Sequence, residues 1–236
     1  MRLDNFIYKS GLTQSRNKAQ ELIKSLQVLV GGKVVSKPSF EVDESNKIEI
    51  LNPKQYVSRA GYKLKSFIKS QDKFLIKDKS CLDIGSSTGG FVQVLLEEGA
   101  KEVVAVDVGS EQLHASLKSS ENLEIFEQTD IRDFSYNQKF DIVTCDVSFI
   151  GIEQILKDID RFAKEYIVIL FKPQFEVGIG AKRDKKGVVK DNFAIKKAKE
   201  KFEAKAQQDW DFVYSSDSIL KGKEGNIETF YCFKKR

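Results

Sequence analysis

The chain has few of the residues that build metal sites and disulfide frames. Its 236 residues include three cysteines and a single histidine. Cys81, Cys145 and Cys232 are odd in number and far apart in the sequence, so they predict neither a disulfide frame nor a metal cluster and are typical of a reducing cytoplasm. His114 has no partner histidine, which argues against a catalytic role for it. No metal cofactor is expected.

Long apolar stretches are missing as well. No apolar run approaches the roughly 18 residues that a membrane span needs, and Met1-Arg2-Leu3-Asp4 lacks the apolar core of a signal peptide. Hydrophobic residues make up 41% of the chain and charged residues 31%, an ordinary balance for a soluble protein. These absences argue against a membrane-active protein. The length suits one large domain and a small one.

The most informative motif that is present spans residues 81–91, Cys-Leu-Asp-Ile-Gly-Ser-Ser-Thr-Gly-Gly-Phe. It predicts a strand, a tight glycine loop and the start of a helix, and Asp107 follows the next apolar run, where a carboxylate can accept from ribose hydroxyls. Asp83, before the first glycine, would repel the pyrophosphate of a dinucleotide. This favours S-adenosylmethionine, which is cationic and has no phosphate, over a dinucleotide.

Strands and helices are expected to alternate from Ser80 onward. The predicted strands lie near residues 80–84, 102–107, 122–127, 140–146, 165–171, 211–216 and 227–233. Such alternation predicts a mainly parallel seven-stranded sheet covered by helices on both faces, with the last two strands forming an antiparallel edge. Residues 173–190, rich in glycine and basic residues, are expected to form a loop at the ligand-binding rim that orders on substrate binding, or else a disordered surface loop.

Four charged residues could carry chemistry. Asp146 and Lys172 each end a predicted strand, so a parallel sheet brings them to the same rim, where a partly desolvated lysine loses its proton more easily. Lys63 lies on the helix before the first strand. Glu228 is expected within an apolar edge strand, where a carboxylate needs a partner. Taken singly each is ambiguous, because a lysine after a strand is usually a solvated strand end.

The first quarter of the chain holds the whole excess of positive charge. Residues 1–60 contain ten Lys and Arg against six Asp and Glu, whereas the other 176 residues contain 29 of each. This imbalance predicts a module that faces a polyanion, with a solubilising surface as the alternative. Residues 1–50 predict a compact α/β unit whose second helix has Thr13 or Ser15 as its cap and basic residues near its start.

This first segment resembles the S4-type RNA-binding module. The matching residues are Arg2-Leu3-Asp4, Gly11-Leu12-Thr13-x-Ser15-Arg16-x-Lys18-Ala19, Val28-x-Val30-x-Gly32-x-x-Val35 and Lys37-Pro38-Ser39. The resemblance implies binding of structured RNA through the helix start and the basic turn. The implied contacts are Arg2, Arg16, Lys18, Lys33 and Lys37, cations that can reach phosphates.

The remainder of the chain resembles FtsJ-type ribose methyltransferases, whose Lys-Asp-Lys-Glu tetrad falls on Lys63, Asp146, Lys172 and Glu228. With the preceding module, the whole chain resembles the TlyA family. The implied organisation is an S4-type domain at 1–52, a linker at 53–60 and a class I, Rossmann-like methyltransferase domain at 61–236. Ser86-Ser87-Thr88 replaces the Ala-Ala-Pro type of loop without disturbing the glycines. The implied donor contacts are Asp83, Gly85, Ser86, Ser87, Thr88, Gly89, Gly90, Phe91, Asp107, Val108, Asp130 and Ile131.

The resemblance implies methylation of a cytidine 2′-hydroxyl in ribosomal RNA, in 23S RNA and alternatively 16S RNA, with RNA or a ribosomal subunit as the partner. Lys172 would accept the proton of the hydroxyl, and Asp146 and Glu228 would orient Lys172. Lys63 would stabilise the negative charge that develops on the ribose oxygen. Methylation at cytosine C5 would need a nucleophilic cysteine, but the Cys145 side chain is expected on the opposite sheet face from Asp146. A ribosome-assembly factor with little catalysis would be expected to have lost the glycines or Lys172, and a haemolysin would need an apolar span.

Overall fold

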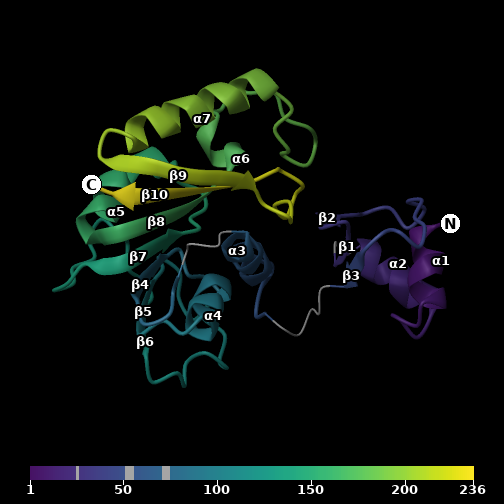
Figure 1. Cartoon of the computed structure of the whole chain (residues 1–236). Coiled ribbons are helices and arrows are strands. Elements are labelled where there is room, and N and C mark those ends of the chain that lie inside the picture. The colour runs from purple at the N-terminus through teal and green to yellow at the C-terminus, as the bar shows by residue number, and fades with distance from the viewer. Residues whose placement is uncertain (25–26, 51–55, 71–74) are drawn as a thin grey trace. The chain divides into compact units, whose positions relative to one another are not determined.

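The computed structural model describes residues 1–24, 27–50, 56–70 and 75–236, which form two compact units, Met1–Tyr56 and Val57–Arg236 (Figure 1). Each unit has its own apolar core. The predicted linker at 53–60 lies partly outside the described residues, and helix α3 begins at Arg59.

The first unit packs two helices on a small antiparallel sheet. Its elements are α1 (Leu3–Lys9), α2 (Arg16–Lys24), β1 (Val28–Val30), β2 (Lys33–Val34) and β3 (Ile48–Ile50), with strand order β2-β1-β3. The predicted cap of α2 is confirmed at Ser15, whose Oγ accepts a hydrogen bond from the Lys18 amide at 3.1 Å. Gly31 and Gly32, both with positive φ, form the two-residue turn between β1 and β2.

The second unit is built on a seven-stranded sheet in the order β6-β5-β4-β7-β8-β10-β9 (Figure 1). Its strands are β4 (Ser80–Ile84), β5 (Glu102–Val106), β6 (Leu123–Phe126), β7 (Phe140–Cys145), β8 (Ala163–Phe171), β9 (Trp210–Asp217) and β10 (Thr229–Lys235). The first five in chain order pair in parallel, and β10 is antiparallel to both of its neighbours. The predicted mainly parallel sheet is confirmed.

Helices cover both faces of this sheet. They are α3 (Arg59–Lys69), α4 (Gly90–Glu97), the 3₁₀ turn η1 (Ile152–Gln154), α5 (Leu156–Phe162), α6 (Pro173–Glu176) and α7 (Asn192–Ala206). Phe230 in β10 stacks on Phe67 of α3, whereas its neighbour Tyr231 meets Phe202 of α7. Because successive strand residues point to opposite faces, α3 and α7 cover opposite sides (Figure 1).

Two expectations about the elements are wrong. Glu228 does not lie within an edge strand, because β10 starts at Thr229 and sits between β8 and β9, which leaves β9 at the edge. Strand and helix also do not alternate throughout, since turns and bends connect β5 to β6 and β6 to β7. In the first of these connections only Leu113 and Leu117 are buried hydrophobics, too few to anchor a helix face.

The segment 173–190 has a defined shape, contrary to the alternative of a disordered loop. It begins with the short helix α6, and Arg183 pairs with Val189 in an isolated β-bridge. The Arg183 guanidinium donates to the carbonyl oxygens of Gln174, Gly178, Ile179 and Ala181 at 2.9–3.3 Å. Side-chain hydrogen bonds thus replace a regular backbone ladder in this segment.

Candidate functional site

Two glycines let the loop after β4 pack closely against its neighbours. Gly85 has φ +81°, and a Cβ there would lie 3.1 Å from backbone atoms of Asp146 and Val147. A Cβ on Gly90 would meet the Ser58 hydroxyl and come within 2.8 Å of the Gly61 amide nitrogen, at the start of α3. The glycine loop therefore holds the ends of β4 and β7 together and draws α3 against α4.

A cavity of about 280 Å³ opens at the carboxyl ends of β4, β5 and β7 and is called here the apolar cavity. A recess of about 600 Å³ adjoins it and shares with it Gly85, Ser87, Asp146 and Ser148; it is called the basic recess. The predicted donor contacts Gly85, Ser87, Asp107, Val108, Asp130 and Ile131 line the apolar cavity, and Ser86, Thr88 and Phe91 line the recess. Asp83, Gly89 and Gly90 line neither.

Asp83 is fully buried beneath the loop. Its Oδ1 accepts a hydrogen bond from the Thr144 hydroxyl at 2.6 Å, and its Oδ2 has no hydrogen-bond partner among the described residues. Burial raises the pKa of the Asp83 carboxyl to about 7, and the hydroxyl of Thr144 opposes that rise. The fold therefore keeps a costly carboxylate directly behind the loop.

Two further carboxylates, Asp107 and Asp130, stand on the wall of the apolar cavity. Asp107 accepts from the backbone amides of Ser87 at 2.8 Å and Gly109 at 2.7 Å, which leaves lone pairs on both oxygens for a ligand hydroxyl. Asp130 is held by the Arg132 guanidinium at 2.6 and 2.9 Å, and this pairing lowers the pKa of the Asp130 carboxyl.

The four predicted catalytic residues form two ion pairs. Lys63 Nζ lies 2.6 Å from Glu228 Oε2, and both side chains are almost fully buried. Lys172 Nζ lies 2.7 Å from Asp146 Oδ1 and donates to the Ser148 hydroxyl at 2.8 Å. Burial raises the pKa of the Asp146 carboxyl, while the ammonium groups of Lys172 and Lys63 oppose the rise. Asp146 and Lys172 directly follow the adjacent parallel strands β7 and β8.

The partner that Glu228 needs is supplied by groups far away in the sequence. Gln174 donates to Glu228 Oε1 at 3.3 Å from α6, while Lys63 approaches from α3. A Cβ at Gly222 would come within 2.5 Å of the same Oε1, so glycine at 222 makes room for the carboxylate. Sequence reasoning did not select Gln174, Ser148 or Gly222, because their roles depend on contacts between distant segments.

Phe149 is another residue that sequence reasoning missed. It follows the end of β7, has φ +68°, leaves 92% of its side chain exposed, and packs against Phe175 at a ring-centroid distance of 5.2 Å. A left-handed backbone and an exposed ring are both unfavourable for phenylalanine unless something uses them. The sequence offers one signal for it, an aromatic residue three positions after Asp146.

Cys145 lies next to Asp146 but belongs to the apolar core. Burial raises the pKa of its thiol to about 12. A thiol in such surroundings is a poor nucleophile, in agreement with the expected orientation of its side chain away from the site.

In the first unit, the buried carboxylate of Asp4 organises two of the predicted RNA contacts. It accepts hydrogen bonds from Arg2 at 3.0 and 3.1 Å, from Arg16 at 3.1 Å and from Gln20 at 2.7 Å, and Arg2 above all lowers the pKa of the Asp4 carboxyl. Both guanidinium side chains stay 45% exposed. The arginines are therefore fixed in direction while still accessible.

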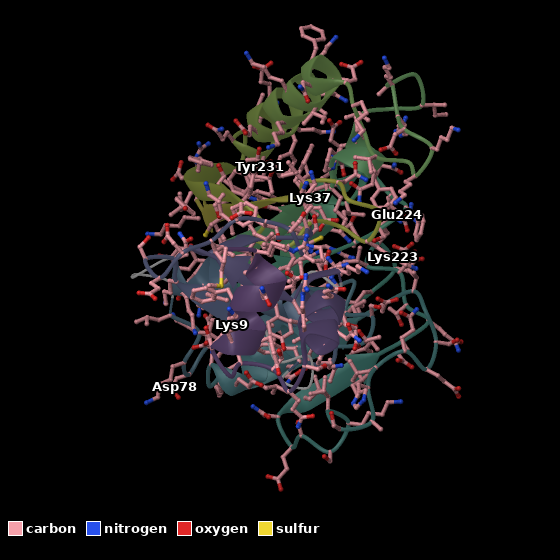
Figure 2. All side chains as sticks on the ribbon, turned by 90° about the vertical axis from the view of Figure 1, so that its right-hand side faces the viewer. Lys9, Lys37, Asp78, Lys223, Glu224 and Tyr231 are labelled. Atoms are coloured by element: carbon pink, nitrogen blue, oxygen red, sulfur yellow. The ribbon has the colours of Figure 1, made fainter. Side chains whose placement is uncertain are left out.

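The three predicted lysine contacts of this unit differ in their surroundings. Lys18 pairs with Glu21 at 2.9 Å one helical turn away. Lys33 in β2 and Lys37 are exposed, and no carboxylate lies within 4.0 Å of either ammonium among the described residues. Figure 2 labels Lys37. Lys33 and Lys37 thus offer free positive charge, whereas an acid offsets that of Lys18.

Comparison with known proteins gives each unit a counterpart. Residues 56–235 match the FtsJ-like methyltransferase family, and residues 1–48 match the S4 domain. The structure also resembles a solved candidate hemolysin from Streptococcus thermophilus with a TM-score of 0.72 and 31% identity, over all of this chain and 88% of that one. None of the described helices is long and apolar enough to cross a membrane.

Curated relatives match over nearly the full length. The chain is 48% identical to the 23S rRNA (cytidine-2′-O)-methyltransferase TlyA of Campylobacter jejuni over 100% of both sequences. It is 34% identical to the 16S/23S rRNA (cytidine-2′-O)-methyltransferase TlyA of Mycobacterium tuberculosis over 97% of this chain and 88% of that protein. The chain therefore belongs to the TlyA family of FtsJ-like methyltransferases.

Proposed function

We propose that this chain transfers a methyl group from S-adenosylmethionine to the 2′-hydroxyl of a cytidine in ribosomal RNA, principally 23S RNA. The observation that carries the proposal is the pair of buried ion pairs, Lys172–Asp146 and Lys63–Glu228, beside the apolar cavity. The names of the Campylobacter and Mycobacterium relatives support cytidine in ribosomal RNA as the substrate. The second of these names also supports 16S RNA as a further target.

The residues of the apolar cavity fit the donor. Asp107 suits the ribose hydroxyls of the donor, since its oxygens keep free lone pairs. Val108, Ile131 and Ile150 suit the adenine ring. Oδ2 of Asp83 has no hydrogen-bond partner among the described residues, and the ionised form of this buried carboxyl suits a cation and not a pyrophosphate. When bound, S-adenosylmethionine supplies a methyl group on a sulfonium that is open to attack by oxygen.

A ribose hydroxyl is a poor nucleophile at neutral pH, so the site has to take its proton. Once Lys172 has released its own proton to solvent, its neutral amine accepts the hydroxyl proton at Nζ while the oxygen–carbon bond forms and the sulfur–carbon bond breaks. Asp146 and Ser148 fix the direction of Nζ. Lys63, which is positioned by Glu228, stabilises the negative charge that develops on the ribose oxygen. The fixed geometry of the reacting groups supplies much of the rate acceleration.

Substitution of Lys172 tests this assignment. We expect Lys172→Ala to abolish methyl transfer while leaving donor binding close to normal, because the lost interaction is made in the transition state. Donor affinity is measured by calorimetry with S-adenosylmethionine and with its demethylated product. Lys164→Ala is the control, since Lys164 lies near the start of β8 and pairs with Asp141, at the other end of the sheet.

Mapping of 2′-O-methyl sites in ribosomal RNA from cells with and without the gene identifies the product. The new linkage resists alkaline cleavage, because a methylated 2′-oxygen cannot attack the phosphate. An alkali-sensitive product with a methylated base would contradict the proposal, as would full activity in Lys172→Ala.

A further inference from the structure

The basic recess holds more positive charge than the proposed chemistry uses. Arg59, Lys63, Lys172 and Lys223 all line it. Lys63 and Lys172 are neutralised by Glu228 and Asp146. Among the residues that the structure describes, no carboxylate lies within 4.0 Å of the charged groups of Arg59 or Lys223. Two uncompensated cations therefore face a recess that shares four lining residues with the apolar cavity.

Both cations are attached to a well-braced part of the fold. Arg59 Nη2 donates to the Lys221 carbonyl at 2.6 Å, which ties the start of α3 to the turn before β10. Within this turn, the Gly222 amide donates to Asn226 O at 2.8 Å, and the buried Asn226 side chain accepts from the Val189 amide at 2.9 Å. Lys223 projects from the tip of this turn, next to Glu224 (Figure 2). Glu224 does not line the recess.

The structure of RNA indicates which group these two cations would contact when a ribose is bound. The 2′-oxygen and the 3′-oxygen of a ribose sit on adjacent carbons, so the phosphodiester on the 3′ side enters the site together with the 2′-hydroxyl. That phosphate carries a full negative charge beside an oxygen that is about to lose its proton, and unneutralised it would oppose deprotonation. Guanidinium and ammonium groups are the side chains that bind phosphate best.

We propose that Arg59 and Lys223 form a binding site for the phosphodiester on the 3′ side of the methylated nucleotide. This inference rests on the proposed 2′-O-methylation and adds to it a second contact point on the same nucleotide. Arg59 uses one donor for the Lys221 carbonyl and has others left for the phosphate, whereas Lys223 contributes an exposed ammonium group.

Lys223→Ala tests the site, with Lys139→Ala as a matched control. Lys139 is an exposed lysine just before β7, at the end of the sheet remote from the recess. We expect Lys223→Ala to raise KM for RNA roughly tenfold. It should also lower the slope of log KM against log salt by about 1, as expected for one lost phosphate contact. Lys139→Ala should match the wild type in both, and thermal unfolding checks that each variant is folded.

A short RNA that ends at the methylated nucleotide tests whether the phosphate on the 3′ side is the one that is bound. Adding a 3′-terminal phosphate should improve kcat/KM for the wild type but not for Lys223→Ala, and equal responses of the two proteins would overturn the assignment. If the wild type methylates ribose but Lys223→Ala and Lys139→Ala have the same KM for RNA and the same salt dependence, the phosphate site alone is overturned. Absence of ribose methylation by the wild type would overturn the proposed function itself.

Discussion

Asp83 is a residue whose burial opposes stability and whose charge suits the proposed donor. Its raised pKa, about 7, means that ionisation costs more in the folded protein than in the unfolded chain. The free energy of unfolding is therefore largest below the unfolded pKa of roughly 4 and falls as the pH rises through about 7. We expect Asp83→Asn to raise the melting temperature at pH 8, with a gain that shrinks toward pH 5.

The same substitution should weaken donor binding, because the amide removes the negative charge that suits a cationic ligand. For the wild type, donor affinity should rise between pH 6 and 8 as Asp83 ionises, and calorimetry at several pH values measures this. Affinity that is independent of pH and unchanged in Asp83→Asn would show that the carboxylate has only a structural role.

We expect the target base to stack on the exposed ring of Phe149. We expect Phe149→Ala to lower kcat/KM for RNA by roughly tenfold or more, since stacking of one base on an aromatic ring is worth about 1–3 kcal/mol. Donor affinity is measured in the same variant, because Phe149 also lines the apolar cavity. Phe193→Ala is the control, because Phe193 is also largely exposed but lies on α7 and lines neither cavity. Equal activities of the two variants would remove Phe149 from the RNA contacts.

At the scale of elements, the contact between α3 and α4 depends on a residue without a side chain. We expect Gly90→Ala to lower the free energy of unfolding by about 1–3 kcal/mol, because the new Cβ would meet the start of α3. Methyl transfer should fall as well, since α3 carries Lys63. Gly180→Ala is the matched control, because no atom lies within 4 Å of its Cβ. Chemical denaturation compares the two variants, and similar stabilities would contradict this account.

Much of this framework could be predicted from local patterns. The apolar runs before Asp83, Asp107 and Asp146 located parallel strands whose carboxyl ends share one rim. Local patterns could not place Glu228, because the start of β10 at Thr229, one residue after it, is set by pairing with β8 and β9. Nor could they reveal that Arg2 and Arg16 share Asp4, or that Arg59 contacts Lys221, since these contacts form only in the folded chain.

At the scale of the whole molecule, the uneven distribution of charge predicts that the first unit supplies RNA affinity and the second unit binds the donor. Removal of residues 1–50 should leave donor binding intact, because the apolar cavity is built entirely from residues 84–155. Methylation of large RNA should fall and become less sensitive to salt, since the exposed charges of Lys33, Lys37 and the two arginines are lost. Activity assays on both proteins across a range of salt concentrations measure this. Equal activities throughout would exclude the first unit as the RNA anchor.

The position of β10 has a consequence for folding of the second unit. This strand comes last in the domain, yet it pairs on both sides, with β8 and with β9. The sheet is therefore complete only when β10 has entered between β8 and β9, and the same step brings Glu228, which directly precedes β10, to Lys63.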